Sequence, residues 1–471
     1  MIGSVVRSPR YAFQKVSPIP RLSWARSSHV RRLATAAASG DGSDLPLAGI
    51  KVLDMTRVLA GEILGTTWTA LYGPTNTVGS TDELGIDCVL EPTLSRLNIL
   101  PEEVDADQDE KMTLVHGDHP MPSIPTNKRD QAKVNRNKRS MGLSFQHPAG
   151  VDILHRLVKE CDVLVENYLP GSLAKYAMDY DTVSKINPNI VYASITGYGQ
   201  TGPYRNRAGY DVMVEAEMGL MHITGTRDGP PVKVGVAVTD LTTGLYTSNS
   251  IIAALFRRFR SPGSGGQHID VALSDCQVAT LANIASSCLI SGQRDSGRWG
   301  TSHPSIVPYK AFKTADGDIL LGGGNDKLYG TLCNRLGKPE WITDEKFKTN
   351  ALRVKHRDEL EELIEAETRK KSTQELLDIF EGSGMPYAAI NDVQDTLNHE
   401  HVLARNMVKE VEHPACGPIK LVNTPVKWSQ STPGIRLPPP LLGQHTNEIL
   451  SDTLGMSKED VEALRSEGVV A

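Results

Sequence analysis

The sequence predicts an α/β fold in which helices pack on a parallel sheet, and three observations support this prediction. An apolar run at 50–55 is bounded by Gly49 and Thr56, which is typical of a short buried strand. Segments with helical and strand periodicity then alternate from 148 to 196. A long helical pattern beginning near Asp240 is followed by another strand pattern at 267–275. Alternation at this length is typical of βαβ units, which build parallel sheets flanked by helices.

The alternating part of the chain is predicted element by element. In residues 148–160, Val151, Ile153, Leu154 and Leu157 fall on one face of a helix. The run at 162–167 then forms a short buried strand. We expect a second helix over 172–186 and a further strand over 190–196.

The second half of the chain has a different texture. After about residue 290, short strands with tight turns are expected. Residues 352–381 are highly charged with helical periodicity, which predicts solvated helices on a smaller domain. The final helix has ordinary capping signals at both ends, with Ser457 as N-cap, Asp460 three residues later and Gly468 past its end.

Residues 72–133 resist assignment. They are rich in Pro, Thr, Asp and Glu, include the acidic run at 102–110, and show neither helical nor strand periodicity. A structureless segment of this length is improbable inside a compact domain. We interpret it as disordered or as an aberrant piece of sequence.

Composition excludes several classes of protein. The chain has 471 residues and a formal net charge of −6, so it lacks the basic surface that nucleic acid requires. No apolar run approaches the roughly 20 residues that cross a membrane. The six cysteines are scattered without a CxxC pair, which indicates free thiols, and no metal-ligand pattern occurs.

The first 40 residues differ from the rest of the chain. They carry seven Lys or Arg residues and several serines, with no acidic residue before Asp41. This composition is typical of a mitochondrial presequence, so we expect residues 1–40 to be a disordered presequence and the protein to lie in the mitochondrial matrix.

Two motifs are weak on their own. GYGQTG (197–202) matches the dinucleotide pattern GxGxxG, but Pro203 stands where a helix should begin, which favours a glycine-rich turn shaping a pocket. The basic cluster in VNRNKRS (134–140), with Arg136, Lys138 and Arg139, suits phosphate groups, although most such clusters are solvated surface.

Two carboxylates are candidates for chemistry. Asp240 lies at the start of the long predicted helix, where unpaired N–H groups and the helix dipole favour its ionised form. Asp211 follows Arg207 in RAGYD, and its simplest interpretation is an ion pair with that arginine. Neither position alone distinguishes a catalytic group from a structural one.

Taken together, these residues resemble the class III (CaiB/BaiF) CoA-transferases. The resemblance covers most of residues 134–471 in order and is carried by the strings LAGIKVLDMTRVLAG (47–61), VNRNKRSMGLSF (134–145), DVLVENYLPGSLAK (162–175), SITGYGQTGP (194–203), RAGYDVMVEAEMGLMHITG (207–225), GVAVTDLTTGLY (235–246), RWGTSHPSIVPYKAFKTADG (298–317), FEGSGMPYAAIND (380–392) and PPPLLGQHT (438–446).

The resemblance implies an activity and a mechanism. The chain would move CoA from an acyl-CoA such as succinyl-CoA to a small dicarboxylic acid such as glutarate, with the CoA thioester as substrate and no tightly bound cofactor. Asp240 takes the position of the nucleophile, which forms an aspartyl anhydride and then an aspartyl-CoA thioester, and Asp211 has a supporting role. For the acceptor's carboxylates, Arg205, Arg207 and Arg298 are candidates.

CoA contacts are also implied by position. Besides Lys138 and Arg139, the resemblance points to five residues, namely Arg57, Leu143, Asn167, Tyr168 and Lys175.

The implied fold is a large Rossmann-like domain built from both chain ends, plus a smaller α+β domain. The large domain would span 46–290, the small one 291–398, and 399–471 would return to the large domain. Two chains would interlock as a homodimer. The resemblance breaks at 62–133, where a helix, a strand and a GDDTR-like segment are missing, and mis-joined exons would explain this.

Two alternative functions stay open. A 2-methylacyl-CoA racemase-like epimerase on the same fold would use an acid and base pair, of which Asp211 is one possible member. An inactive CoA-binding protein is the other alternative.

Overall fold

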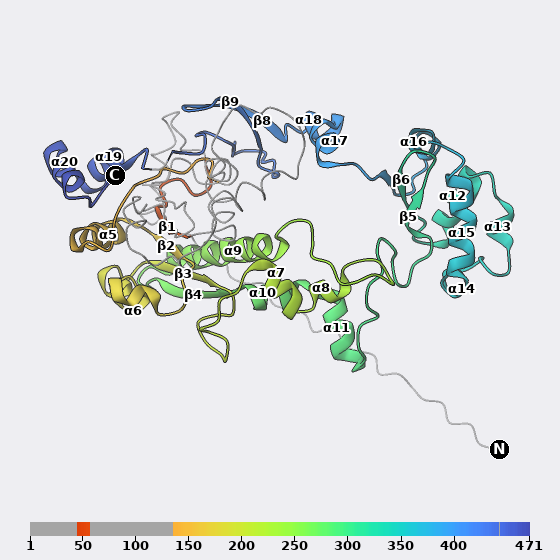
Figure 1. The fold of residues 1–471 in the computed structure, drawn as a ribbon, viewed down its shortest axis with the longest axis horizontal. Coiled ribbons are helices and arrows are strands. Elements are labelled where there is room, and N and C mark those ends of the chain that lie inside the picture. The colour runs from red at the N-terminus through yellow and green to blue at the C-terminus, as the bar shows by residue number, and fades with distance from the viewer. Residues whose placement is uncertain (1–44, 57–134, 442) are drawn as a thin grey trace, which may run out of the picture. The chain divides into compact units, whose positions relative to one another are not determined.

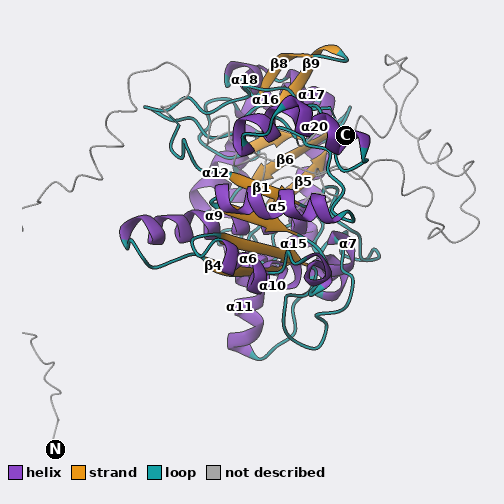
Figure 2. Cartoon of the chain, turned by 90° about the vertical axis from the view of Figure 1, so that its left-hand side faces the viewer, coloured by secondary structure: helices purple, strands orange, loops and turns teal. Residues whose placement is uncertain are grey.

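The structure is a computed structural model that describes residues 45–56, 135–441 and 443–471 (Figure 1). The predicted presequence, the irregular segment at 72–133 and Arg57 lie outside the described residues. The strands and helices of the described part are distinguished by colour in Figure 2.

A four-stranded sheet confirms the predicted parallel arrangement. Its strands are β1 (Val52–Met55), β2 (Val163–Glu166), β3 (Val191–Thr196) and β4 (Gln267–Ala272), in that spatial order, and each neighbouring pair is parallel. The helices between them are α5 (Pro148–Glu160), α6 (Tyr180–Ile186), α7 (Asp211–Glu217), α8 (Leu220–Ile223) and α9 (Val238–Arg260). After β4 come α10 (Leu273–Thr280) and α11 (Ala282–Ser291).

Both faces of this sheet are covered, as a parallel sheet requires. Successive strand residues point to opposite faces, so Leu164 and Tyr192 join one hydrophobic cluster while Val163 and Val191 join another. The first cluster packs against α5 and α6 and the second against α7, α9 and α10. The apolar spacing of the sequence therefore specifies a three-layer arrangement.

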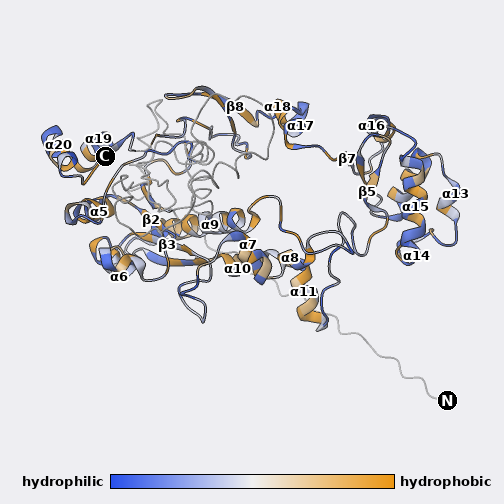
Figure 3. Ribbon diagram, in the orientation of Figure 1, coloured by the Kyte–Doolittle hydropathy of each residue, from blue (hydrophilic) through white to orange (hydrophobic). Residues whose placement is uncertain are grey.

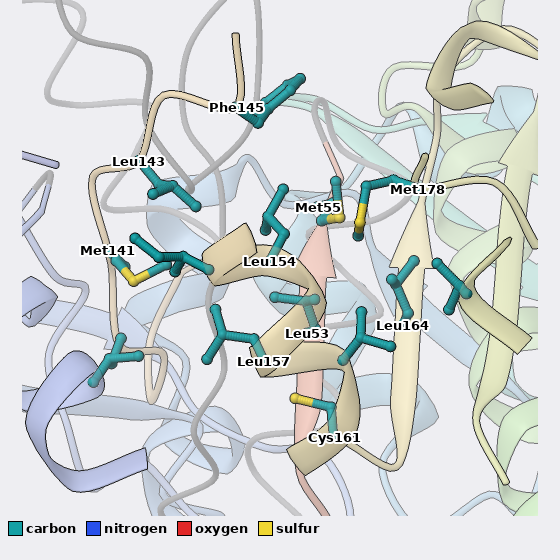
Figure 4. Packing of buried hydrophobic residues seen from close by; sticks show 14 of the residues in the cluster. Leu53, Met55, Met141, Leu143, Phe145, Leu154, Leu157, Cys161, Leu164 and Met178 are labelled. Carbon is teal, nitrogen blue, oxygen red and sulfur yellow. The ribbon is translucent and has the colours of Figure 1, made fainter. Parts of the chain in front are cut away.

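The two ends of the described chain share one core. The cluster around Leu53 and Leu154 (Figure 4) also contains Ile449, Val461 and Val470 from the C-terminal segment. That segment holds α19 (Thr446–Glu448), the π-helical turn η3 (Ile449–Thr453) and α20 (Lys458–Ser466). The N–H of Ser144 donates to the carbonyl of Val469 at 2.8 Å, which ties the C-terminus to residues 141–145.

The predicted helix at 172–186 is wrong as a single element. The structure has a 3₁₀ turn, η2 (Ser172–Tyr176), followed by α6. Ala177 adopts a left-handed conformation with φ of 52°, which ends the turn. Asp179 then accepts a hydrogen bond from the N–H of Thr182 and caps α6. A local side-chain cap therefore starts a new helix inside a continuous helical pattern.

The remaining residues form two antiparallel sheets and several helices. One sheet contains β5 (Tyr309–Lys313), β6 (Asp318–Gly322) and β7 (Tyr387–Ala389), and the other is the hairpin of β8 (Val408–His413) and β9 (Gly417–Val422). The helices are α12 (Asp326–Arg335), α13 (Glu340–Thr343), α14 (Asn350–Lys355), α15 (Arg357–Thr368), α16 (Thr373–Phe380), α17 (Val393–Asn398) and α18 (Glu400–Ala404). The domain boundaries at 290 and 398 stay a prediction.

The charged stretch 352–381 forms helices as predicted, but they are not simply solvated. Leu360 and Ile364 belong to a hydrophobic core with residues of β5 and β6. The guanidinium of Arg353 is fully buried and donates to the carbonyls of Val307 and Phe347 and to Asp326. Its hydrogen bonds offset the desolvation of the charge, which is why an arginine is tolerated there.

Two further expectations from the sequence concern membrane-spanning helices and the state of the cysteines. Among the described residues, no helix has both the length and the apolar character needed to pass through a lipid bilayer. Five of the six cysteines fall in the described part, and all five are free thiols.

Candidate active site

A cavity of about 550 Å³ lies at the carboxyl ends of the parallel strands. Asn167 follows β2, Thr196 ends β3 and Leu273 follows β4, and all three line it. Open α/β sheets bind ligands at this edge. The other lining residues are Leu169, Ile195, Gly197, Ala208, Gly209, Tyr210, Asp211, Val212, Lys233, Val234, Val236, Ala237 and Asp240.

Glycines shape one wall of this cavity. A Cβ atom on Gly197 would lie 2.8 Å from the Cα of Gly209, so neither position has room for a side chain. The close approach brings the GYGQTG turn against the RAGYD segment that leads into α7. The GYGQTG motif therefore forms a glycine-rich turn at a pocket, which is the interpretation that the sequence favours.

Asp240 lies in the first turn of α9, three residues after the N-cap Ala237. Its side chain is 7% exposed and borders the cavity. Within the described part of the chain, its carboxyl oxygens receive no hydrogen bond, although its backbone N–H is engaged. The carboxylate is thus held at the cavity wall by its backbone rather than by side-chain partners.

Asp211, the first residue of α7, binds the start of α9. Its Oδ1 accepts hydrogen bonds from the N–H groups of Thr239 at 2.8 Å and Asp240 at 3.1 Å. The expected ion pair with Arg207 is wrong, because Arg207 instead donates to Glu217 at 2.8 Å. Asp211 therefore acts as an N-terminal cap supplied from a neighbouring helix.

The pKa of Asp240 is raised to about 7, mainly by burial and secondly by the negative charge of Asp211. This differs from the ionised state expected for a carboxylate at a helix N-terminus. The physical reason is that burial removes the Asp240 carboxylate from water and the nearby Asp211 carboxylate repels it, and these two effects outweigh the helix dipole. A carboxyl group of this basicity is a stronger nucleophile than an ordinary aspartate.

Lys233 is a lining residue that the sequence analysis missed. It is the single cationic side chain among the described residues around the cavity. The arginines predicted to bind the carboxylates of the acceptor acid have other partners in the structure. Arg207 pairs with Glu217, and Arg298 donates to the carbonyls of Gly229 and His222. Arg205 is not among the lining residues. The available signal was the position of Lys233, two residues before the string GVAVTDLTTGLY (235–246) that contains Asp240.

The residues predicted to contact CoA have different surroundings in the structure. Asn167 lines the cavity, and its neighbour Tyr168 donates its N–H to Glu166 at 2.8 Å. The Lys175 ammonium lies 4.7 Å from the centroid of the Tyr176 ring. Leu143 is fully buried in the core, forms a bridge with Val470 and is not one of the lining residues.

The basic pair expected to bind phosphate is engaged with carboxylates. The Lys138 ammonium is 1% exposed and lies 3.2 Å from Oδ2 of Asp54. Arg139 lies 3.9 Å from Glu448 and 3.8 Å from Asp452, and burial lowers its pKa more than these charges raise it. Lys138 therefore forms a buried ion pair in this structure, while the Arg139 side chain is partly exposed.

No cluster of three or more metal-ligating side chains occurs among the described residues. The cavity instead presents two carboxylates, Asp211 and Asp240, with Lys233 and otherwise mostly apolar and glycine residues. This set is suited to covalent chemistry by a carboxylate on a neutral acyl group.

Comparison with known proteins assigns the class. The family model described as CoA-transferase family III matches residues 125–446. A crystal structure of a CAIB/BAIF family protein from Brucella suis superposes with a TM-score of 0.70 at 35% identity, covering 87% of this chain and 99% of that one. The chain therefore belongs to CoA-transferase family III, whose members use CoA thioesters as substrates.

Curated relatives narrow the comparison further. The chain is 40% identical over 457 residues to a protein named succinyl-CoA:glutarate CoA-transferase from Mus musculus, covering 95% of this chain and 98% of the relative. It is 42% identical over 441 residues to the protein of the same name from Homo sapiens, covering 93% of each.

Proposed function

We propose that this enzyme transfers CoA from an acyl-CoA such as succinyl-CoA to a small dicarboxylic acid such as glutarate, with Asp240 as the covalent nucleophile. The observation that carries the proposal is the Asp240 carboxyl group, buried at the wall of a cavity and raised in pKa to about 7. Within the described residues, the Asp240 carboxylate lacks the hydrogen bonds that would lower its nucleophilicity.

The first half-reaction begins at the thioester. An Asp240 oxygen attacks the carbonyl carbon, the C–S bond breaks, and CoA leaves as the thiolate. The thiolate then attacks the Asp240 carbonyl of the resulting anhydride, which releases the donor's carboxylate and leaves an aspartyl-CoA thioester. Each step exchanges one acyl bond for another, so the thioester's free energy is kept.

The second half-reaction reverses this order. The acceptor carboxylate attacks the aspartyl-CoA thioester, the thiolate leaves, and it returns to the acceptor's carbonyl in the new anhydride. Asp240 is regenerated as a carboxylate. Hydrolysis of the anhydride would waste the thioester, so the mostly apolar and glycine-lined wall serves to limit water.

Lys233 supports a dicarboxylate as acceptor. A second carboxylate brought next to Asp211 and Asp240 would be repelled unless a cation lay in the same cavity. Lys233 supplies that cation, and we assign it to the carboxylate that does not react. The names of the mouse and human relatives point to the same substrate class.

The CoA moiety is assigned to residues that follow β2 in the chain and to one arginine of the segment before α5. Asn167 and Tyr168, which follow β2, and Lys175 in η2 are proposed to contact it, together with Arg139. Arg57 is carried over from the resemblance alone.

Residues 1–40 are proposed to direct the enzyme to the mitochondrial matrix. Their basic, acid-free composition supports this. Fusing them to a fluorescent protein should send it to mitochondria, and replacing their arginines with glutamine should leave it in the cytosol.

The nucleophile is tested by trapping. Wild type is mixed with succinyl-CoA and hydroxylamine, and mass spectrometry should find a hydroxamate at Asp240. Asp240→Asn should lose at least about 1000-fold of the turnover with glutarate. Asp275→Asn, which changes an exposed aspartate of α10 outside the cavity, should retain full activity.

Two results would count against the proposal. An active Asp240→Asn variant would remove the nucleophile assignment. Exchange of substrate α-protons in deuterated water, without CoA transfer to any carboxylic acid, would instead identify an epimerase.

A further inference from the structure

The buried carboxyl group of Glu215 is not used by the reaction just described. It lies on α7, one helical turn after Asp211, and its side chain is 0% exposed. Its two oxygens have different surroundings. Oε2 accepts a hydrogen bond from the N–H of Val234 at 3.1 Å, whereas Oε1 is buried without a hydrogen-bond donor in the described part of the chain.

An ionised glutamate would be costly in this position. A buried carboxylate oxygen without a donor loses its hydration and gains nothing in return. A protonated carboxyl group resolves the difficulty, because it becomes a donor and needs only an acceptor. The neighbouring acceptor is the Asp211 carboxylate, whose Oδ1 takes the two backbone N–H groups at the start of α9.

We propose that Glu215 is a positioning residue that stays protonated in the resting enzyme and donates its proton in a hydrogen bond to Asp211. The inference rests on the proposed role of Asp240 as nucleophile. Glu215 holds Asp211, Asp211 holds the amides of Thr239 and Asp240, and this relay fixes the nucleophile at the cavity wall. Its Oε2 also accepts a hydrogen bond from Val234, the neighbour of Lys233 in the chain. The Glu215 carboxyl group therefore positions both Asp240 and Lys233, the two proposed substrate contacts.

The charges around Glu215 agree with this protonation state. Burial raises its pKa most; the Val234 N–H lowers it, and both the charge of Asp211 and a hydrogen bond with that side chain raise it again. Lys233 has only a smaller lowering effect. The elements packed against α7 also carry titratable groups, namely His222 on α8, Asp240, Tyr246, Arg257, Arg258 and Arg260 on α9, and Asp275 and Cys276 on α10.

Glutamine and alanine variants separate positioning from mere packing. In Glu215→Gln, the amide N–H donates to Asp211 and the carbonyl oxygen accepts from Val234, so kcat should stay within about threefold of wild type. Glu215→Ala breaks both contacts and should lower kcat by about 10- to 100-fold, the usual effect of misplacing a reacting group. Far-ultraviolet circular dichroism and thermal unfolding check that both variants fold.

The pH profile supplies a readout that packing alone would not move. Wild-type kcat should fall at alkaline pH, where the shared proton leaves, and Glu215→Gln should lack this fall. Infrared spectroscopy at about pH 8 should show a buried carboxylic acid C=O stretch in wild type that Glu215→Gln lacks. If Glu215→Gln loses as much activity as Glu215→Ala, or if that infrared band is absent from wild type, Glu215 is ionised and the inference is wrong. Hydroxylamine trapping at Asp240 in wild type tells this failure apart from a failure of the nucleophile assignment.

Discussion

At the scale of single residues, the proposed reactivity of Asp240 depends on two opposing effects. Its place in the first turn of α9 favours the carboxylate, because the helix dipole is positive there. Burial and the charge of Asp211 favour the protonated form, and they prevail, since the pKa of Asp240 rises to about 7. The protonated form would not act as the proposed nucleophile, so this balance would set the reactive fraction of Asp240 at a given pH.

The balance predicts a pH dependence. Because kcat/KM reports the free enzyme, it should rise about tenfold per unit as pH increases toward about 7 and then level off, until the alkaline fall that loss of the Glu215 proton would cause. Asp211→Asn removes a negative charge that disfavours ionised Asp240, so its rising limb should move to lower pH. Asp275→Asn serves as the control. A limb that moves to higher pH in Asp211→Asn would mean that Asp211 mainly holds the α9 amides and exerts no net repulsion on Asp240.

Lys233 makes a separate prediction about the acceptor. Lys233→Met should lower kcat/KM for glutarate by about 10- to 100-fold, the value of one or two charge-assisted hydrogen bonds. The same variant should leave valerate, which has the same chain length and one carboxylate, nearly unchanged, and Lys233→Arg should retain most glutarate activity. Lys370→Met, which alters an exposed lysine of the α15–α16 connection, is the control. Equal losses for glutarate and valerate would show that Lys233 does not recognise the second carboxylate.

At the scale of elements, a buried ion pair joins β1 to the segment at 135–145. Asp54 accepts hydrogen bonds from the N–H and hydroxyl of Thr56 and from Lys138. Lys138→Met would leave a buried carboxylate short of a partner and should lower the free energy of unfolding by about 3–5 kcal/mol. Lys313→Met breaks the exposed pair with Asp318 and should change it by less than about 1 kcal/mol. Urea unfolding measures both. A stable Lys138→Met variant with a raised KM for succinyl-CoA would instead place Lys138 in the CoA site.

The elements themselves were largely predictable because their apolar spacing is local information. The helix α5 has its expected bounds, and the ends of strands β1 to β3 lie within two residues of their expected positions. The broken helix at 172–186 was missed because Asp179 acts as a cap only where the chain has already turned at Ala177. The partners of Lys138 and Glu215 were not predictable either, because burial depends on contacts between residues distant in the chain. One signal was present, since Asp54 is the only charged residue in an otherwise apolar strand.

At the scale of the whole molecule, an apolar surface on α11 has no cover within the described part of the chain. None of its residues is buried, although Figure 3 shows it as largely hydrophobic. Leu289 and Ile290 are 84% and 88% exposed. The helices α9 and α10 add further exposed apolar side chains, namely Leu245, Tyr246, Phe256, Phe259 and Val278. Large exposed apolar patches are typical of surfaces that bind another protein.

We therefore expect a second copy of the chain to cover α11, in the homodimer that the resemblance in the sequence implies. Light scattering after size-exclusion chromatography should give twice the mass of one chain. Ile290→Asp would bury a charge in that interface and should yield a monomer with little transferase activity. Val393→Asp, at a residue of α17 that is 76% exposed, controls for the general effect of adding a surface charge and should stay dimeric. An Ile290→Asp variant that stays dimeric and active would show that α11 is not part of the interface, and some other chemistry would then have to explain why two such apolar side chains face outward.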